Sequence, residues 1–323
     1  MHLPAPRGEL SAAVTAALGG HRGALPPVRG VDPHGEDLTL ALHVLYELHY
    51  RGFDGVDEGL EWDPDLLRLR AALERPFLAA VREEVGTAEV AAVVEDLLVE
   101  RLPGSGVSHF LRERGEWWHF QEVFTHRSIY HLKEADPHAW VIPRLRGRAK
   151  AALVAVEFDE YGGGRAERMH SRLFADLLDA AGLSSEYLHY LDVVPAPALA
   201  TVNLMSMFGL HRSLRGALVG HFAATEITTG PSARRMVSAL RKLSAPRECV
   251  RFYTEHIEAD AVHEQVLRHE VIGGLLEDEP HLAGDVAFGL MATELLEDRL
   301  SNHVLGAWQD GVSSLREAAD VLV

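Results

Sequence analysis

Apolar residues recur every three or four positions along most of the chain, which is the spacing of one face of an α-helix. Leu38, Leu42 and Leu45 follow it in one of the first such segments. Strict apolar–polar alternation never extends beyond a few residues, so no strand is predicted. The pattern predicts an all-α fold with a short C-terminal helix and helices over 9–18, 36–51, 64–84, 87–101, 106–132, 144–160, 165–182, 197–209, 211–229, 231–244, 248–276 and 283–308.

Glycine and proline divide this helical pattern. The segment 103–106, Pro-Gly-Ser-Gly, is the strongest boundary signal in the chain. Gly-Gly-Gly at 162–164 and Gly-Pro at 230–231 predict turns further on. We therefore predict a helical domain over 106–323 and an N-terminal helical extension over 1–105, partly flexible at 1–35.

Composition narrows the class of protein. With 323 residues, of which 47% are hydrophobic, the chain is long enough to bury a large core. Its net charge of −17 argues against nucleic acid and anionic membrane surfaces as partners. Cys249 is the only cysteine, the first residues lack the apolar region of a signal peptide, and no apolar run is long enough to span a bilayer. We expect a cytoplasmic protein that binds neither nucleic acid nor membrane.

The most informative motif is His256-x3-Asp260-x2-His263, in a stretch without glycine or proline that is typical of a helix. At 3.6 residues per turn, the three side chains fall within about 60° of one another. A core face does not tolerate an aspartate without a partner, and imidazole with carboxylate is a ligand set for iron, manganese or zinc. The motif predicts a metal site on one face of this helix.

A second segment offers two more ligands, Glu160 and His170. On an unbroken helix their spacing would place them about 80° out of phase. The three glycines between them permit a local bend that aims both side chains at one point. The alternative is a plain helix–turn–helix in which Gly162 caps the first helix.

Glu226 is the third candidate, because it stands in a segment that is otherwise apolar or small. A glutamate buried there needs a metal ion or a cation, and Arg234 and Arg235 are close in sequence. The whole set has three carboxylates and three imidazoles, which suits two metal ions better than one. Two irons that cycle between ferrous and ferric states can activate O2, and we take Glu160, Glu226 and Asp260 as the catalytic carboxylates.

In order and spacing, these residues resemble the haem-oxygenase-like non-haem di-iron oxidases and oxygenases. The resemblance covers roughly residues 106–310 and rests on Glu160 with its Tyr-Gly-Gly-Gly, Met169 before His170, the isolated Glu226, and the histidine–aspartate motif. It implies a bundle of about seven core helices, two Fe ions, O2 as co-substrate and no haem. The metal ligands that it implies are Glu160, His170, Glu226, His256, Asp260 and His263.

The resemblance also implies an oxidoreductase that acts on a small molecule. We favour an oxygenase that N-oxygenates an amine or amino acid in specialised metabolism. Oxidative desaturation, C–C cleavage or decarboxylation of an amino or fatty acid is the alternative. A ferritin-like ferroxidase or iron store is a further alternative, because Glu167 and His170 have the i, i+3 spacing of that bundle. A purely structural helical scaffold would make the six residues a coincidence.

Charge and apolar content give the remaining expectations. Arg127, Lys133 and Arg144 are candidates to anchor a substrate carboxylate through charge-assisted hydrogen bonds. Redox chemistry of this kind is compatible with an external electron donor. Residues 36–101 carry more apolar residues than a lone helical arm needs, so we expect a homodimer in which the N-terminal helices contribute to the contact.

Overall fold

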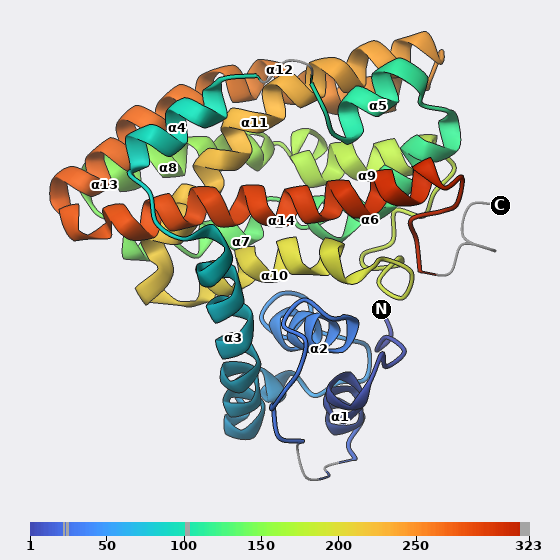
Figure 1. Ribbon diagram of the computed structural model, residues 1–323, viewed down its shortest axis with the longest axis vertical. Helices are drawn as coiled ribbons and strands as arrows, with labels where there is room; N and C mark the ends of the chain where they lie inside the picture. The colour runs from blue at the N-terminus through green and yellow to red at the C-terminus, as the bar shows by residue number, and fades with distance from the viewer. Residues whose placement is uncertain (22, 24–25, 101–103, 317–323) are drawn as a thin grey trace.

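The computed structural model in Figure 1 describes residues 1–21, 23, 26–100 and 104–316, and these contain helices but no strand. The predicted all-α fold is therefore confirmed. The α-helices are α1 (Glu9–Leu18), α2 (Glu36–Glu47), α3 (Pro64–Val85), α4 (Val90–Leu98), α5 (Val107–Arg114), α6 (Trp117–His131), α7 (Asp136–Ala139), α8 (Gly147–Glu160), α9 (His170–Ala180), α10 (Ala196–Leu210), α11 (Arg215–Lys242), α12 (Arg247–Val266), α13 (Gly273–Asp278) and α14 (Ala283–Gln309). A π-helical turn, Leu267–Ile272, joins α12 to α13. None of the described helices is both long and apolar enough to cross a membrane.

Helix α10 is the most completely buried element. All of its residues except Pro197 and Leu210 are buried. A helix that is apolar on every side must be covered on every side. The cover comes from α2, α6, α7, α11 and α14, which all pack against it. Figure 1 shows α10 between the N-terminal helices below and the long helices above.

The long helices α11 and α14 approach each other closely because small residues face one another. A Cβ atom on Gly220 would lie 2.1 Å from the carbonyl oxygen of Val286, and one on Gly289 would lie 2.0 Å from that of Ala217. Any larger side chain at either glycine would force the two backbones apart. Helix α12 packs along the other side of α11, so α11 is held in place between two long helices.

The N-terminal helices share one packed interior with the rest of the chain. Helix α2 is buried along most of its length between α1, α3 and α10, and α4 lies on α11 and α14 (Figure 1). Polar contacts also cross the predicted boundary: Asn203 Nδ2 donates to the carbonyl of Thr39 at 2.8 Å, and His211 Nε2 lies 2.9 Å from Glu74 Oε2. The division at residue 105 stays a prediction.

The helix bounds differ from the sequence pattern most clearly at two places. The predicted turn at 230–231 is wrong, because α11 continues through Pro231. A proline inside a helix costs roughly 3 kcal/mol, and the packing of α11 on both neighbours offsets that cost. Conversely, the single predicted helix over 106–132 is broken at Gly115, whose backbone is extended. The predicted C-terminal helix falls largely outside the described residues.

Candidate metal centre

Helix α12 carries the histidine–aspartate motif on its buried side. His256, Asp260 and His263 are only 5%, 3% and 2% exposed, although the helix as a whole is rich in charge. The Nδ1 atom of His256 donates to the carbonyl of Phe252 at 2.8 Å, one turn earlier. That bond leaves Nε2 of His256 as the free ligand atom, which is how metal-binding imidazoles are held.

The three glycines after α8 bring Glu160 and His170 together. Helix α8 ends at Glu160, and the next α-helix, α9, begins at His170. All three glycines have positive φ, and a Cβ on Gly162 would lie 2.6 Å from the backbone nitrogen of Met169. The turn therefore closes only without a side chain at Gly162. As a result, Glu160 Oε2 lies 2.8 Å from His170 Nδ1.

Glu226 faces α12 and not an arginine. Its Oε2 atom lies 3.4 Å from His263 Nδ1. The side chain of Arg235 is engaged elsewhere, with Glu100 and, at 2.9 Å, with Ser108 Oγ. No ion pair joins Glu226 to Arg235 or Arg234 among the described residues. The arginine partner considered from the sequence is therefore absent there, and Glu226 contacts an imidazole instead.

Glu134 is a site residue that sequence reasoning missed. It follows the end of α6, is buried, and places Oε2 2.8 Å from His131 Nδ1 and Oε1 3.8 Å from His256 Nε2. Helical spacing gives no direction for a side chain beyond a helix end. The available signal was its position three residues after His131.

The structure sorts these residues into two groups of possible ligands. Within each group, one nitrogen or oxygen atom of every residue lies within 4.8 Å of the others. All members are buried, and the chain supplies them from α8, α9, α11, α12 and the segment after α6. The groups are Glu134, His170 and His256, and Glu160, Glu226 and His263.

Unsatisfied polar atoms show that these groups fit a metal ion. His170 Nδ1, His256 Nε2, His263 Nδ1 and Glu226 Oε2 are buried and make no hydrogen bond. Buried polar atoms are rarely left in that condition. His170 Nδ1 is close to a carboxylate oxygen but lacks hydrogen-bond geometry. Convergent ligand atoms of this kind are what a cation needs, and the mixture of imidazole and carboxylate suits iron.

The charges within the site change the acidity of both α12 histidines. Burial lowers the pKa of His256, but the carboxylate of Glu134 outweighs burial and raises that pKa to about 10. Burial likewise lowers the pKa of His263, and Glu160 and Glu226 raise it to about 11. The buried carboxylates thus stabilise positive charge beside them. A metal ion supplies that charge when it replaces the protons on its ligands.

Two further carboxyl groups lie beside the site but in neither group. Asp260 Oδ2 and both carboxyl oxygens of Glu157 are buried without a hydrogen-bond partner. Burial and the charge of Glu226 raise the pKa of Asp260 to about 9. Burial and Glu160 raise the pKa of Glu157 well above its ordinary value. Sequence reasoning did not single out Glu157, whose only signal is its position one turn before Glu160.

Glu167, the acid of the ferritin-like alternative, does not reach the site. It is exposed in the short 3₁₀ turn Ala166–Arg168, before α9 begins. The i, i+3 spacing does not place Glu167 on the same face as His170, because the two residues do not share a helix. The ferritin-like reading of Glu167 is therefore wrong for this structure.

The three predicted substrate anchors are paired within the chain. Arg127 forms two contacts with Glu297, one of 2.7 Å from Nη1 to Oε1. Lys133 is buried against Glu47, with 2.8 Å between Nζ and Oε2. Arg144 donates to the last carbonyls of α10, at 2.8 Å to Leu210. These contacts give each cation a structural role, and none of the three lines a pocket described below.

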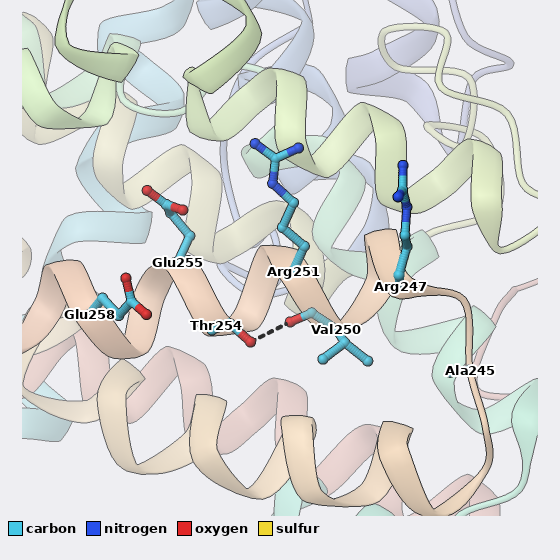
Figure 2. A pocket seen from close by; sticks show the side chains of 7 residues that line it. All are labelled: Ala245, Arg247, Val250, Arg251, Thr254, Glu255 and Glu258. Atoms are coloured by element: carbon cyan, nitrogen blue, oxygen red, sulfur yellow. Dashed lines mark hydrogen bonds between the residues drawn. The ribbon is translucent and has the colours of Figure 1, made fainter.

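Among the pockets formed by the described residues, two border α12, and the second of these reaches the candidate ligands. The first, of about 490 Å³, lies along the exposed side of the helix. Figure 2 shows Arg247 and Arg251 projecting from the same side of α12 there, and no residue of the two metal groups lines this pocket. The second, of about 520 Å³, lies between α11, α12 and the end of α4, and its lining includes Glu226 and Asp260. The second pocket therefore connects the surface with the site.

A helical fold with buried histidine–carboxylate groups is the setting of a metal-dependent redox enzyme. The chain belongs to the iron-containing redox enzymes, whose family model matches residues 121–298, more than half of the chain. The matched region contains both groups of candidate ligands. The chain is also similar to the nitrosourea synthase of Streptomyces achromogenes subsp. streptozoticus, with 26% identity over 194 residues. That match covers 58% of this chain and 41% of the relative, so the chain spans about two-fifths of the relative's length.

Proposed function

We propose that the chain is an O2-dependent non-haem di-iron oxygenase that oxidises nitrogen in a small amine or amino acid. The observation that carries this proposal is the pair of buried three-residue groups. A nitrosourea contains an N-nitroso group, so the name of the similar protein favours oxidation at nitrogen over oxidation at carbon. The chain covers less than half of that relative, and its own substrate is therefore part of the proposal.

Each group would hold one iron ion. Ferrous ions bound there would supply the electrons that reduce O2. The protein contributes the ligands, fixes the tautomer of His256 through Phe252, and buries every member of the two groups. Asp260, which neighbours both groups, completes the ligand set that we propose. The proposed ligands are Glu134, Glu160, His170, Glu226, His256, Asp260 and His263.

A small substrate would enter through the pocket that contains Glu226 and Asp260. Its volume of about 520 Å³ is within the range of small-molecule sites. Ile227, Pro231 and Ile257 give it apolar walls, and Arg234 adds a cation. Such a pocket suits a molecule with an apolar body and a charged end.

Anaerobic loading with ferrous iron followed by exposure to O2 tests the proposal. We expect close to two irons per chain, an O2-dependent transient absorbance, and a hydroxylated or nitroso product from an amine in the substrate panel. Binding of one ion or none would contradict the di-iron centre. Desaturated or chain-shortened acids in place of nitrogen oxides would select the alternative reaction. Many ferric ions per chain would indicate iron storage.

The oligomeric state, the location and the electron donor of the protein are proposals as well. We propose that it acts as a homodimer in the cytoplasm and takes electrons from an external donor. The lone Cys249 is buried, in keeping with a chain that does not rely on disulfides. Light scattering at micromolar concentration tests the dimer, and a monomeric mass would contradict it.

A further inference from the structure

A fully buried ion pair joins the end of α2 to the residue that precedes Glu134. Lys133 is 1% exposed and Glu47 is not exposed at all, and 2.8 Å separates Nζ from Oε2. Lysine and glutamate are rarely buried so completely. Removing two charges from water is costly and is tolerated only when their remaining polar atoms are also satisfied.

Both partners of this pair make further contacts. The hydroxyl of Tyr187 donates to Glu47 Oε1 at 2.7 Å, so both carboxylate oxygens of Glu47 are engaged. The ammonium of Lys133 also lies 4.1 Å from the centre of the Tyr50 ring, which is a cation–π contact. The pair is therefore a built feature of the interior, with partners from α2, from the turn after it and from the segment before α10.

A second contact holds the residue before Lys133. Arg51, in the turn after α2, donates from Nη2 to the carbonyl of Leu132 at 3.1 Å and lies over the Tyr187 ring at 4.1 Å. The two residues immediately before Glu134 are thus both held from the N-terminal part of the chain. Helix α6 has already ended at His131, so continuous helical hydrogen bonding does not fix Glu134 in place.

The residues after Glu134 contact the residue that follows Glu160, a member of the other metal group. The backbone nitrogen of Asp136 donates to the carbonyl of Lys133 at 2.8 Å, and Tyr161 donates its hydroxyl to Asp136 Oδ1 at 2.9 Å. Tyr161 directly follows Glu160. The segment carrying Glu134 is therefore held between α2 on one side and the end of α8 on the other.

We propose that Glu47 and Lys133 are positioning residues that hold the Glu134 carboxylate toward His170 and His256. The proposal rests on the di-iron centre proposed above. An apolar contact would stabilise the same segment but would permit it to slide, whereas an ion pair with fixed acceptors specifies one register. Through this pair, the N-terminal helices become part of the metal site.

The test compares metal affinity with stability in matched variants. A single change would leave one buried charge unpaired and risks preventing folding, so the main variant is Glu47→Gln combined with Lys133→Met. We expect this double variant to fold but to bind one of two ferrous or cobaltous ions roughly tenfold more weakly, as is usual when a group that orients a ligand is lost. Anaerobic titration with each metal alone measures affinity, and urea unfolding measures stability.

Glu74→Gln is the matched control. Glu74 is also a buried acid of the N-terminal part. It accepts a hydrogen bond from Tyr46 at 3.0 Å and contacts His211 of the core at 2.9 Å, but it is not next to a candidate ligand. We expect this variant to lose stability and keep its affinity for both ions. If it loses affinity as the double variant does, a general loss of packing explains both results and the positioning role is overturned.

A mutant cycle with Glu134→Gln separates positioning from simple packing. If Glu47 and Lys133 act through Glu134, their replacement should change metal affinity little once Glu134 is gone. An unchanged tenfold effect in that background would overturn the proposal, as would unchanged affinity of the double variant itself. Wild-type protein that binds no metal in the same titration would contradict the di-iron centre, and the positioning role with it.

Discussion

Glu160 and His170 are ten residues apart in the chain and meet at 2.8 Å across a turn of three glycines. This contact aligns α8 and α9 so that each contributes to a different candidate metal group. The residue immediately after Glu160 also contacts the segment that carries Glu134. The end of α8 therefore contacts residues of both groups and fixes the position of one group relative to the other.

Replacing Glu160 should be far more harmful than replacing its neighbour Glu167. Glu160→Ala removes a ligand of one group and the partner of His170, so we expect loss of one iron and of O2 reactivity. Glu167 is exposed outside the site, and Glu167→Ala should retain both. Iron analysis and O2-dependent absorbance on the two variants measure this difference. Equal losses would refute the assignment of the ligands.

Gly162→Ala should disturb the site through the backbone. Its φ of 73° is costly for any residue with a Cβ, by roughly 1–2 kcal/mol, and the added Cβ would contact Met169 at 2.6 Å. Gly164→Ala is the control, because its φ is also positive but its Cβ would come no closer than 3.8 Å to Phe158. We expect both to lose stability in urea and only Gly162→Ala to lose iron affinity. Similar affinities in the two variants would contradict the close-packed turn.

Arg234→Gln should weaken the binding of anionic substrates. Arg234 is exposed, lines the pocket that contains Glu226 and Asp260, and makes no ion pair among the described residues. Arg241, exposed in the last turn of the same helix and outside that pocket, provides the control Arg241→Gln. We expect KM for a carboxylate-bearing amine to rise about tenfold, in keeping with the loss of a charge-assisted hydrogen bond. The same molecule with its carboxylate converted to an amide should not respond.

Stability should fall in acid because of buried neutral histidines, of which His126 is a clear case. Burial lowers its pKa to about 3, whereas an unfolded histidine titrates near 6.5. Between these values the unfolded chain binds the proton and the folded chain does not, so stability decreases as pH falls from 6.5 toward 3. At about pH 5 the loss from this residue is on the order of 2 kcal/mol.

His126→Gln should remove that part of the pH dependence, while the side chain can still contact Ser314, which His126 Nε2 approaches at 2.8 Å. Urea unfolding near neutral pH and near pH 5, on samples treated with a chelator, measures the effect. His2→Gln is the control, because that side chain is almost fully exposed. A variant that loses as much stability in acid as the wild type would contradict the neutral, buried state of His126.

Much of the site follows from local sequence rules. The relative directions of His256, Asp260 and His263 depend only on helix geometry, which is why their shared face could be predicted. The bend between Glu160 and His170 depends on three adjacent glycines, and only glycine adopts those backbone angles readily. The all-α fold likewise follows from the spacing of apolar residues, because one helical stripe must be buried.

The tertiary structure decided what local rules cannot reach. Glu134 lies beyond a helix end, so its direction depends on residues far away in sequence, including Glu47. Lys133 was a candidate substrate anchor because a lone cation in a sequence has no visible partner, yet its partner lies 86 positions earlier. Helix α11 continues past Pro231 because packing on both neighbours outweighs the lost hydrogen bond. Periodicity specifies which side of a helix is buried, and only the packing of helices on one another specifies which charges meet inside.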